Sequence, residues 1–165
     1  MKKLSAVILL IMCAVLCTAC FSKDKNEGSQ SAGSGGYVVY ENEETGLFGY
    51  KDADGNVVIE CKFERANPFF EGRAAVKLNR RFGYIDEDGN PVTPFIFTSA
   101  GNFSSSRAVV TDEDSKCGYI DTDGKLVIEC KYTSATNFDL DGIATVVYEG
   151  RELNIDINGN EVIEK

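Results

Sequence analysis

The chain has 165 residues, 26 of them acidic and 17 basic, with a formal net charge of −9, 43% hydrophobic residues and no histidine. This acidic balance argues against binding to nucleic acid and against electrostatic adhesion to anionic lipid. The lack of histidine removes the commonest general base, the Ser–His and Cys–His nucleophile pairs and most zinc sites.

The first 19 residues are typical of an export signal. Two lysines precede an apolar run from Leu4 to Leu16, which is shorter than the roughly 20 residues that cross a bilayer as a helix. The run ends in Leu-Cys-Thr-Ala-Cys at 16–20, which resembles the lipobox of bacterial lipoproteins. The resemblance implies that residues 1–19 are a helical lipoprotein signal peptide and that Cys20 carries the lipid. An uncleaved anchor and an ordinary secreted protein are the alternatives.

Residues 20–36 are polar and rich in glycine and serine. Such a segment cannot bury enough apolar surface to order itself, so it is predicted to be a flexible, disordered tether. Random-coil scaling gives it a reach of roughly 20–25 Å, enough to hold a domain clear of the lipid headgroups.

From residue 37 onward the sequence repeats itself with a period of 34 or 35 residues. The glycines that mark this period are Gly55, Gly89, Gly124 and Gly159. A fixed period of this size indicates one supersecondary unit used four times, each packed on its neighbour. We place these units at about 37–63, 74–97, 108–132 and 144–165, within one β-repeat domain that spans 37–165.

Each unit contains three short β-prone runs. The second run is the Gly-Tyr-Ile-Asp strand, and the third follows an Asp-x-Asp-Gly turn. Val57, Ile59, Cys61 and Phe63 alternate with other residues in the third run of the first unit, which predicts a strand with one buried face. The turn is typical of a hairpin because aspartate bonds the turn backbone and glycine adopts a positive φ. The fold class is therefore predicted to be all-β, with four three-stranded antiparallel meanders.

Connectors of about ten residues join the units, at 64–73, 98–107 and 133–143, and each contains Ala-x-x-Phe. We expect the alanine to allow close approach and the phenylalanine to fill the seam between neighbouring units. A ligand-facing role for the phenylalanine is the alternative. These pairs are Ala66/Phe69, Ala100/Phe103 and Ala135/Phe138.

Three elements together resemble the bacterial WG repeat over about residues 46–165. They are Phe-Gly-Tyr-Ile-Asp-x-x-Gly followed by Val-Ile, then aromatic-x-x-Ala-x-x-Phe, and then a strand of small residues. The tryptophan that names the family is replaced, since Phe48, Phe82 and Cys117 precede the glycines and the chain has no tryptophan. The resemblance implies a β-rich, non-enzymatic module common on exported bacterial proteins, whose ligands are largely undefined.

Four such units can stack as an open β array or close into a small propeller-like ring. The fourth unit favours the open form, because Glu152, Leu153 and Asn154 replace its aromatic-Gly-Tyr. Glu161 and Lys165 also enter its apolar face. A polar, atypical end unit is typical of a cap on an open array.

The domain retains three cysteines after the leader and Cys20. Cys61 and Cys130 occupy the same repeat position, where the middle unit has Phe95, and Cys117 replaces Phe48 and Phe82. A cysteine that is interchangeable with phenylalanine is most simply a small buried hydrophobe. A disulfide or a reactive thiol is the alternative.

Two repeated patterns are candidates for ligand binding. The paired acids of the turns, such as Asp52/Asp54 and Asp86/Asp88, offer oxygen ligands for calcium, but an EF-type loop needs a third ligand and a glutamate that these turns lack. The tyrosines Tyr50, Tyr84 and Tyr119, with Arg73 and Arg107, could form a binding ladder or a cross-strand packing ladder. We therefore assign no catalytic, cofactor-binding or metal residue.

The sequence thus predicts a non-catalytic, lipid-anchored repeat module that presents a β surface to an envelope protein or a cell-wall glycan. It is expected to need no cofactor and to bind no nucleic acid. Export and the lipid on Cys20 would place it on the outer face of the bacterial cytoplasmic membrane, or on the periplasmic side in a two-membrane host. The alternatives are a calcium-stabilised envelope module and a hydrolase.

Overall fold

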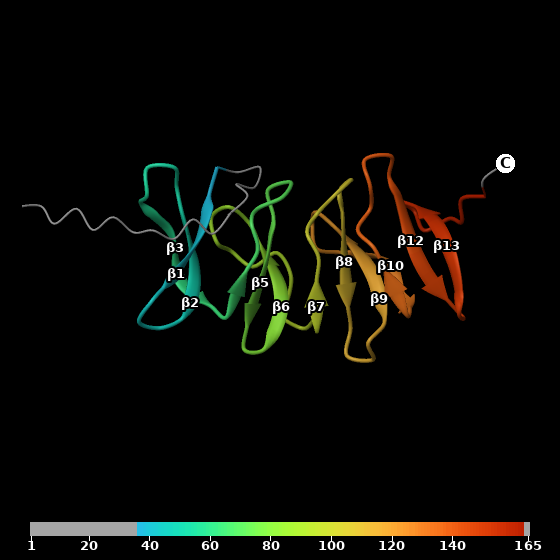
Figure 1. Cartoon of the computed structure of the whole chain (residues 1–165), viewed down its shortest axis with the longest axis horizontal. Helices are drawn as coiled ribbons and strands as arrows, with labels where there is room; N and C mark the ends of the chain where they lie inside the picture. Colours follow the sequence, from blue (N-terminus) through green and yellow to red (C-terminus); the bar gives the residue numbers. More distant parts are fainter. Residues whose placement is uncertain (1–35, 164–165) are drawn as a thin grey trace, which may run out of the picture.

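The computed structural model describes residues 36–163 (Figure 1). The predicted signal peptide, the lipid site at Cys20 and most of the predicted tether lie outside this range. Within it the chain forms strands and no helix, as the period-two patterning predicts. The strands are β1 (Val38–Asn42), β2 (Leu47–Lys51), β3 (Val57–Phe63), β4 (Arg65–Ala66), β5 (Ala74–Leu78), β6 (Arg81–Ile85), β7 (Ser99–Ala100), β8 (Arg107–Thr111), β9 (Cys117–Asp121), β10 (Leu126–Tyr132), β11 (Ser134–Ala135), β12 (Ile143–Tyr148) and β13 (Arg151–Asp156).

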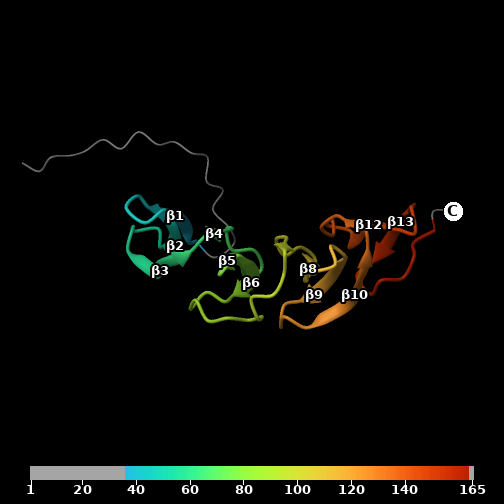
Figure 2. The same cartoon turned by 90° about the horizontal axis from the view of Figure 1, so that it is seen from below.

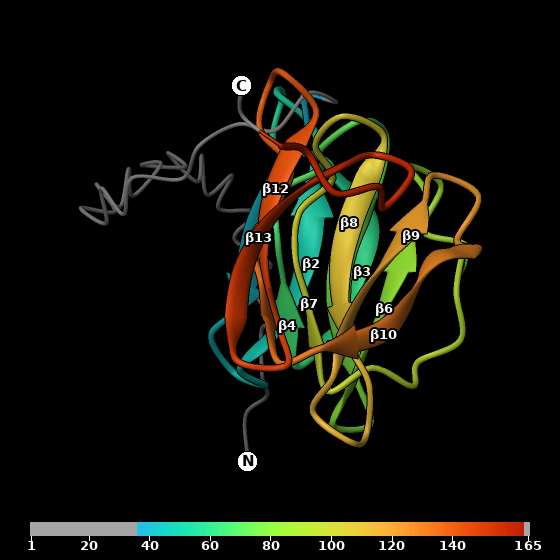
Figure 3. The ribbon, with the colours of Figure 1, turned by 90° about the vertical axis from the view of Figure 1, so that its right-hand side faces the viewer.

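The strands form four antiparallel sheets that follow one another in chain order. Their strand orders are β1-β2-β3, β4-β5-β6, β7-β8-β9-β10 and β11-β12-β13. The sheets stand in a row, with the first and last at opposite ends (Figure 1). The row bends into an open arc when seen from below (Figure 2), and the sheets lie one behind another when viewed along it (Figure 3). The predicted open array is therefore confirmed, and the ring is wrong.

Each connector contributes a short strand that the sequence analysis did not predict. β4, β7 and β11 each pair with the first long strand of the following unit. The alanine of Ala-x-x-Phe lies in this pairing every time, opposite a valine: Ala66↔Val76, Ala100↔Val110 and Ala135↔Val146. Two residues are too few to show a period-two pattern, so the sequence carries no alternation signal for these strands.

The third run of each unit forms a full strand only in the first and third units, as β3 and β10. In the second unit it makes only the isolated bridges Phe82↔Phe97 and Ile85↔Pro91. Pro91 and Pro94 lie in this run, and proline cannot donate a ladder hydrogen bond. In the fourth unit the run makes the single bridge Ile155↔Glu161.

The core consists of three similar seams, one between each pair of adjacent sheets. The first seam buries Tyr50, Ile59, Phe63, Phe69, Ala74, Val76 and Ile85. The second buries Ala75, Tyr84, Phe97, Phe103, Ala108, Val110 and Ile120. The third buries Tyr119, Ile128, Tyr132, Phe138, Ala144, Val146 and Ile155. Most of these side chains recur at the repeat period, so each seam is a copy of its neighbour.

In the first and third units the glycine before the tyrosine is needed because the third strand crosses it closely. A Cβ at Gly49 would lie 2.4 Å from the carbonyl oxygen of Ile59, and one at Gly118 would lie 2.6 Å from that of Ile128. The pairing register shifts at this crossing in both sheets. In the fourth unit Leu153 takes the glycine position and packs on the third seam, where no long third strand passes over it.

Candidate functional site

The four Asp-Gly turns have the same local structure. In each, the first aspartate accepts backbone N–H groups from the residues two and four positions later, at 2.8–3.1 Å. The turn glycines all have φ between 79° and 85°. The accepting carboxylates are those of Asp52, Asp86, Asp121 and Asp156. The predicted turn, in which aspartate bonds the backbone and glycine adopts a positive φ, is confirmed at all four positions.

These hydrogen bonds also lower the pKa of three corner carboxyls. Asn56 donates its side-chain amide to Asp52 and Asn160 does the same for Asp156, and these bonds are the largest cause of the lowered pKa. Burial acts to raise the pKa of Asp86, but the hydrogen bonds from Asn90 and Asp88 and the charge of Arg73 lower it overall. The carboxylates therefore serve the turns in which they lie.

The calcium alternative requires several acids around one point. Among residues 36–163, no group of three or more acidic or cysteine side chains is placed to hold a metal ion. Neighbouring units therefore bring no three such side chains together at a turn within this part of the chain.

The three repeated tyrosines are packing residues of the seams. Tyr50, Tyr84 and Tyr119 are each 0% exposed, and burial raises the pKa of all three phenols. Each hydroxyl donates a hydrogen bond to a backbone carbonyl 17 residues later, in the next connector. The acceptors are the carbonyl oxygens of Asn67 at 2.7 Å, Gly101 at 2.7 Å and Thr136 at 2.8 Å. The packing ladder, and not the binding ladder, is what the structure contains.

The connector phenylalanines fill the seams as predicted. Their rings contact the same tyrosines, with centroid separations of 4.7–5.1 Å. The pairs are Tyr50–Phe69, Tyr84–Phe103 and Tyr119–Phe138. Phe69, Phe103 and Phe138 are at most 3% exposed, so packing in the seams is their main role, and Phe103 and Phe138 also contribute to the lining of a hollow along the connectors.

The two repeated arginines tie each unit to the turn of the next. The Nε of Arg73 donates to the carbonyl oxygen of Thr122 at 2.9 Å, and that of Arg107 donates to Ile157 at 3.0 Å. Each also bonds the carbonyl of the residue before it. Their guanidinium groups are therefore engaged with backbone and do not form a free row for carboxylates.

The three described cysteines are free thiols and are half-buried, not fully buried as predicted. Cys130 packs on the second seam and Cys117 on the third, so these two thiols lie on opposite faces of the third sheet. Burial is the largest cause that raises the pKa of Cys130, to about 11. A thiol that stays protonated at neutral pH is a poor nucleophile.

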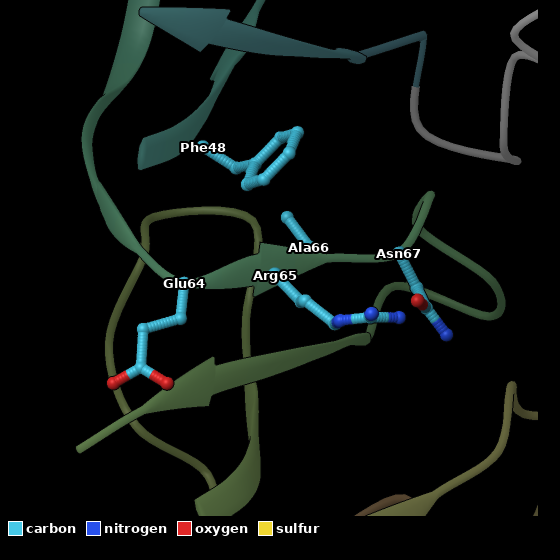
Figure 4. Close-up of a pocket in the computed structure, with 5 residues that line it drawn as sticks. All are labelled: Phe48, Glu64, Arg65, Ala66 and Asn67. Carbon is cyan, nitrogen blue, oxygen red and sulfur yellow. The ribbon is translucent and has the colours of Figure 1, made fainter. Parts of the chain in front are cut away.

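The surface formed by residues 36–163 has at least two hollows. One, of about 360 Å³, lies between the first two sheets and is lined by Phe48 and residues 64–67. The Phe48 ring faces Ala66 there, while the Glu64 carboxylate extends away from it (Figure 4). Phe48 stands at the position where the WG motif has tryptophan.

The second hollow, of about 490 Å³, lies along the connectors. Its lining includes Phe70, Asn102, Asn137 and Leu140, and the Leu140 side chain is 98% exposed. No sequence pattern had predicted this hollow. The sequence does contain a signal for part of it, the segment Asp139-Leu-Asp-Gly142 inside a connector. This segment forms the same aspartate-capped turn as the corners, and the turn carries Leu140 at the hollow.

Comparison with protein families agrees with this repeated geometry. The model of the WG containing repeat matches residues 48–81, 82–117 and 118–151, which is more than half of the chain. The chain belongs to the WG repeat family. No curated protein matched it.

Each range that the family model matches as one WG repeat corresponds to a seam between two sheets and not to a single sheet. The match at 48–81 contains six of the seven buried residues of the first seam, and the match at 118–151 contains six of the seven of the third. Each repeat therefore supplies the end of one sheet, a connector and the start of the next sheet. The seventh residue, Ile85 in the first seam and Ile155 in the third, lies beyond the match, so the residues that follow each match complete its seam.

Proposed function

We propose that this WG-repeat chain is a non-catalytic, lipid-anchored module of the bacterial envelope that presents a β surface to a protein or a cell-wall polymer. One observation carries the non-catalytic part. The repeated side chains that could do chemistry, namely tyrosines, arginines and corner aspartates, all bond to the chain's own backbone. What remains accessible is an extended, repeated surface, which suits binding better than catalysis.

The anchor part of the proposal is supported by sequence. The Leu-Cys-Thr-Ala-Cys segment that ends at Cys20 resembles a lipobox and is followed by a Gly/Ser-rich stretch to residue 36. No helix within residues 36–163 is long and apolar enough to cross a membrane. Attachment through a lipid on Cys20 would put the β array on the outer face of the cytoplasmic membrane, or on the periplasmic side where there are two membranes.

Detergent phase partition of the chain expressed in a bacterial host tests the anchor. The wild-type chain should enter the detergent phase, and Cys20→Ala should move it to the aqueous phase or leave an uncleaved precursor. Cys13→Ala is the matched control, because it changes a leader cysteine outside the lipobox-like segment and should partition like the wild type. A processed Cys20→Ala chain that still enters the detergent phase would disprove the lipid site.

A substrate panel tests the non-catalytic assignment. Glycan and peptide substrates incubated with the purified chain should show no turnover above the buffer. Turnover that persists through purification and follows the protein peak would contradict the proposal and favour the hydrolase.

A further inference from the structure

In each later unit the first long strand pairs with a short connector strand. The first long strand of the first unit, β1, has no such partner among the described residues. In units two to four the outer edge of β5, β8 or β12 is covered by the short connector strand β4, β7 or β11. β1 is an edge strand, and among the described residues it pairs with β2 alone. An open strand edge is a ready template for pairing with another extended segment.

The molecule itself shows what covers such an edge. In every covered case two carbonyl oxygens of the long strand accept backbone N–H groups from residues three positions apart in the connector. In the second unit these bonds are Glu64 N to Lys77 O at 2.8 Å and Asn67 N to Ala75 O at 2.9 Å. The third and fourth units repeat them with Thr111 and Val109, and with Val147 and Thr145, at 2.8–3.0 Å.

The pairing registers identify the matching carbonyls on β1. Val76 lies opposite Gly83 in the second sheet, and Tyr40 lies opposite Gly49 in the first. Val39 and Glu41 on β1 therefore correspond to Ala75 and Lys77. Because alternate residues of a strand direct their backbone groups to the same side, the carbonyls of Val39 and Glu41 face the open edge.

The face beside this edge is also unfinished. Where the later sheets bury Ala74, Val76 and Ile85, the first sheet presents Val38, Tyr40 and Lys51, as the registers show. Val38 is 37% exposed, and the Lys51 ammonium lies 4.2 Å from the centre of the Tyr40 ring. In the later units the connector phenylalanine covers this region of the sheet.

Charge and side-chain size specify the missing segment further. Glu41 is exposed, and the hairpin that follows carries the exposed acids Glu43 and Glu44. The connector residue that pairs with the Glu41 equivalent is Arg65, which is followed by Ala66 and, three residues later, by Phe69. A basic residue opposite Glu41 would form a favourable cross-strand pair.

We propose that the β1 edge is a docking site for an extended segment of a partner protein with the pattern basic–small–x–x–aromatic, bound antiparallel to β1. The segment supplies the N–H groups for the Val39 and Glu41 carbonyls and places its aromatic ring beside Val38 and Tyr40. This mode is β-strand addition, in which backbone bonds give affinity and side chains give specificity. The inference rests on the proposed binding function and names its surface and the chemistry of its partner.

The probe is an N-acetylated, C-terminally labelled peptide with the sequence of residues 64–73, Glu-Arg-Ala-Asn-Pro-Phe-Phe-Glu-Gly-Arg, so that the Glu64 equivalent carries an amide N–H, added to the full chain in detergent micelles. Fluorescence anisotropy should show saturable binding. The same peptide N-methylated at the amides equivalent to Glu64 and Asn67 loses both edge hydrogen bonds, so we expect its affinity to fall at least tenfold. Replacing the Phe69 equivalent by alanine should weaken binding about tenfold.

Glu41→Lys tests the charge on the protein side. This substitution should lower the affinity for the peptide about fivefold to tenfold. Glu152→Lys, which changes an exposed glutamate of β13 at the other end of the array, should leave the affinity unchanged. Equal binding of the methylated and unmethylated peptides, or no saturable binding at millimolar peptide, would overturn the proposal.

Residues 29–35 of the chain itself are a competing occupant, although they contain no basic or aromatic residue. If their deletion raises the affinity more than tenfold, the chain covers its own edge and the proposed partner segment is wrong. Failure of Cys20 lipidation would leave these binding measurements unchanged, so the two proposals fail separately.

Discussion

At the scale of single residues, the repeated polar side chains of this protein act as ties between units. A tyrosine hydroxyl that is buried must find a hydrogen-bond partner, and each of the three finds one in the following connector. Arg73 and Arg107, which precede the second and third units, each donate a hydrogen bond to the Asp-Gly turn of the unit after that one. Tyrosine and arginine often form binding surfaces, but in this chain the repeated ones hold neighbouring units together through hydrogen bonds to the backbone.

Tyr84→Phe removes one of these ties without changing the ring. The carbonyl of Gly101 loses its 2.7 Å hydrogen bond, so we expect a loss of about 1–2 kcal/mol in the free energy of unfolding. Urea unfolding followed by circular dichroism measures it. Tyr148→Phe is the control, because that tyrosine is only half-buried and should cost less. Equal losses for the two would show that the hydroxyl bond of Tyr84 contributes nothing.

At the scale of the strand, the geometry of each unit depends on a close crossing at the glycine that precedes the tyrosine. Gly49 and Gly118 each lie against the backbone of the third strand, which cannot move without breaking its own pairing. Gly83 instead lies against the side chain of Phe95, 2.8 Å from a Cβ placed there, because the proline-containing third run does not form a full strand. The glycine at this repeat position is therefore confined by backbone in the first and third units and mainly by a side chain in the second.

Alanine substitutions at these glycines separate the two situations. Gly49→Ala and Gly118→Ala should destabilise the protein by about 1–3 kcal/mol, since the backbone must shift to admit a methyl group. Gly83→Ala should cost less, because the Phe95 ring can turn aside. Thermal or urea unfolding of the three variants gives the comparison, and a larger loss at Gly83 than at Gly118 would contradict this interpretation.

The Asp-Gly corners predict how stability depends on pH. The pKa values of Asp52, Asp86 and Asp156 are lower in the folded state than the ordinary value, about 3.9 for an unfolded chain. Their stabilisation is therefore fully present above about pH 5 and is lost as the pH falls through the folded-state values.

Asparagine at these three positions tests the prediction. It keeps a side-chain oxygen acceptor, as Asn42 does in the β1–β2 hairpin, but carries no charge. The triple variant should show a smaller fall in melting temperature between pH 5 and pH 2.5 than the wild type. An identical fall in both proteins would mean that other groups control acid unfolding.

At the scale of the whole molecule, stability is distributed over three nearly equal seams. Each sheet contacts only its neighbours in the row, so the array resembles a one-dimensional chain of coupled units. The last sheet ends the row with a polar face, where Asn154 replaces the buried tyrosine and its side-chain oxygen accepts a hydrogen bond from the Thr145 hydroxyl at 3.0 Å. This polar outer face agrees with the predicted capping character of the fourth unit.

Damage to one seam should therefore stay local. Phe138→Ala removes a ring that packs 4.7 Å from Tyr119 in the third seam, and the loss is expected to be about 3–5 kcal/mol. Amide hydrogen exchange should rise first in β11–β13 and leave β1–β3 protected. Phe69→Ala in the first seam is the mirror control and should expose β1–β3 first. Uniform exchange in both variants would indicate one cooperative unit.

Much of this fold could be predicted because its signals are local and repeated. The spacing of Gly55, Gly89, Gly124 and Gly159, the alternation in 57–63 and the Ala-x-x-Phe connectors predicted strands, corners and seam-filling phenylalanines. The polar end unit predicted an open array. These features depend on backbone preference and side-chain period, which a short stretch of sequence carries by itself.

Only the tertiary structure decided what each repeated side chain contacts. Whether Tyr84 meets a ligand or the carbonyl of Gly101, and whether Arg73 faces solvent or the Thr122 turn, depends on the offset between adjacent sheets. That offset is set by packing across a seam, between residues 17 to 50 positions apart, and no local period encodes it. The open edge of β1 emerged in the same way, because an edge exists only once the neighbours of a strand are known.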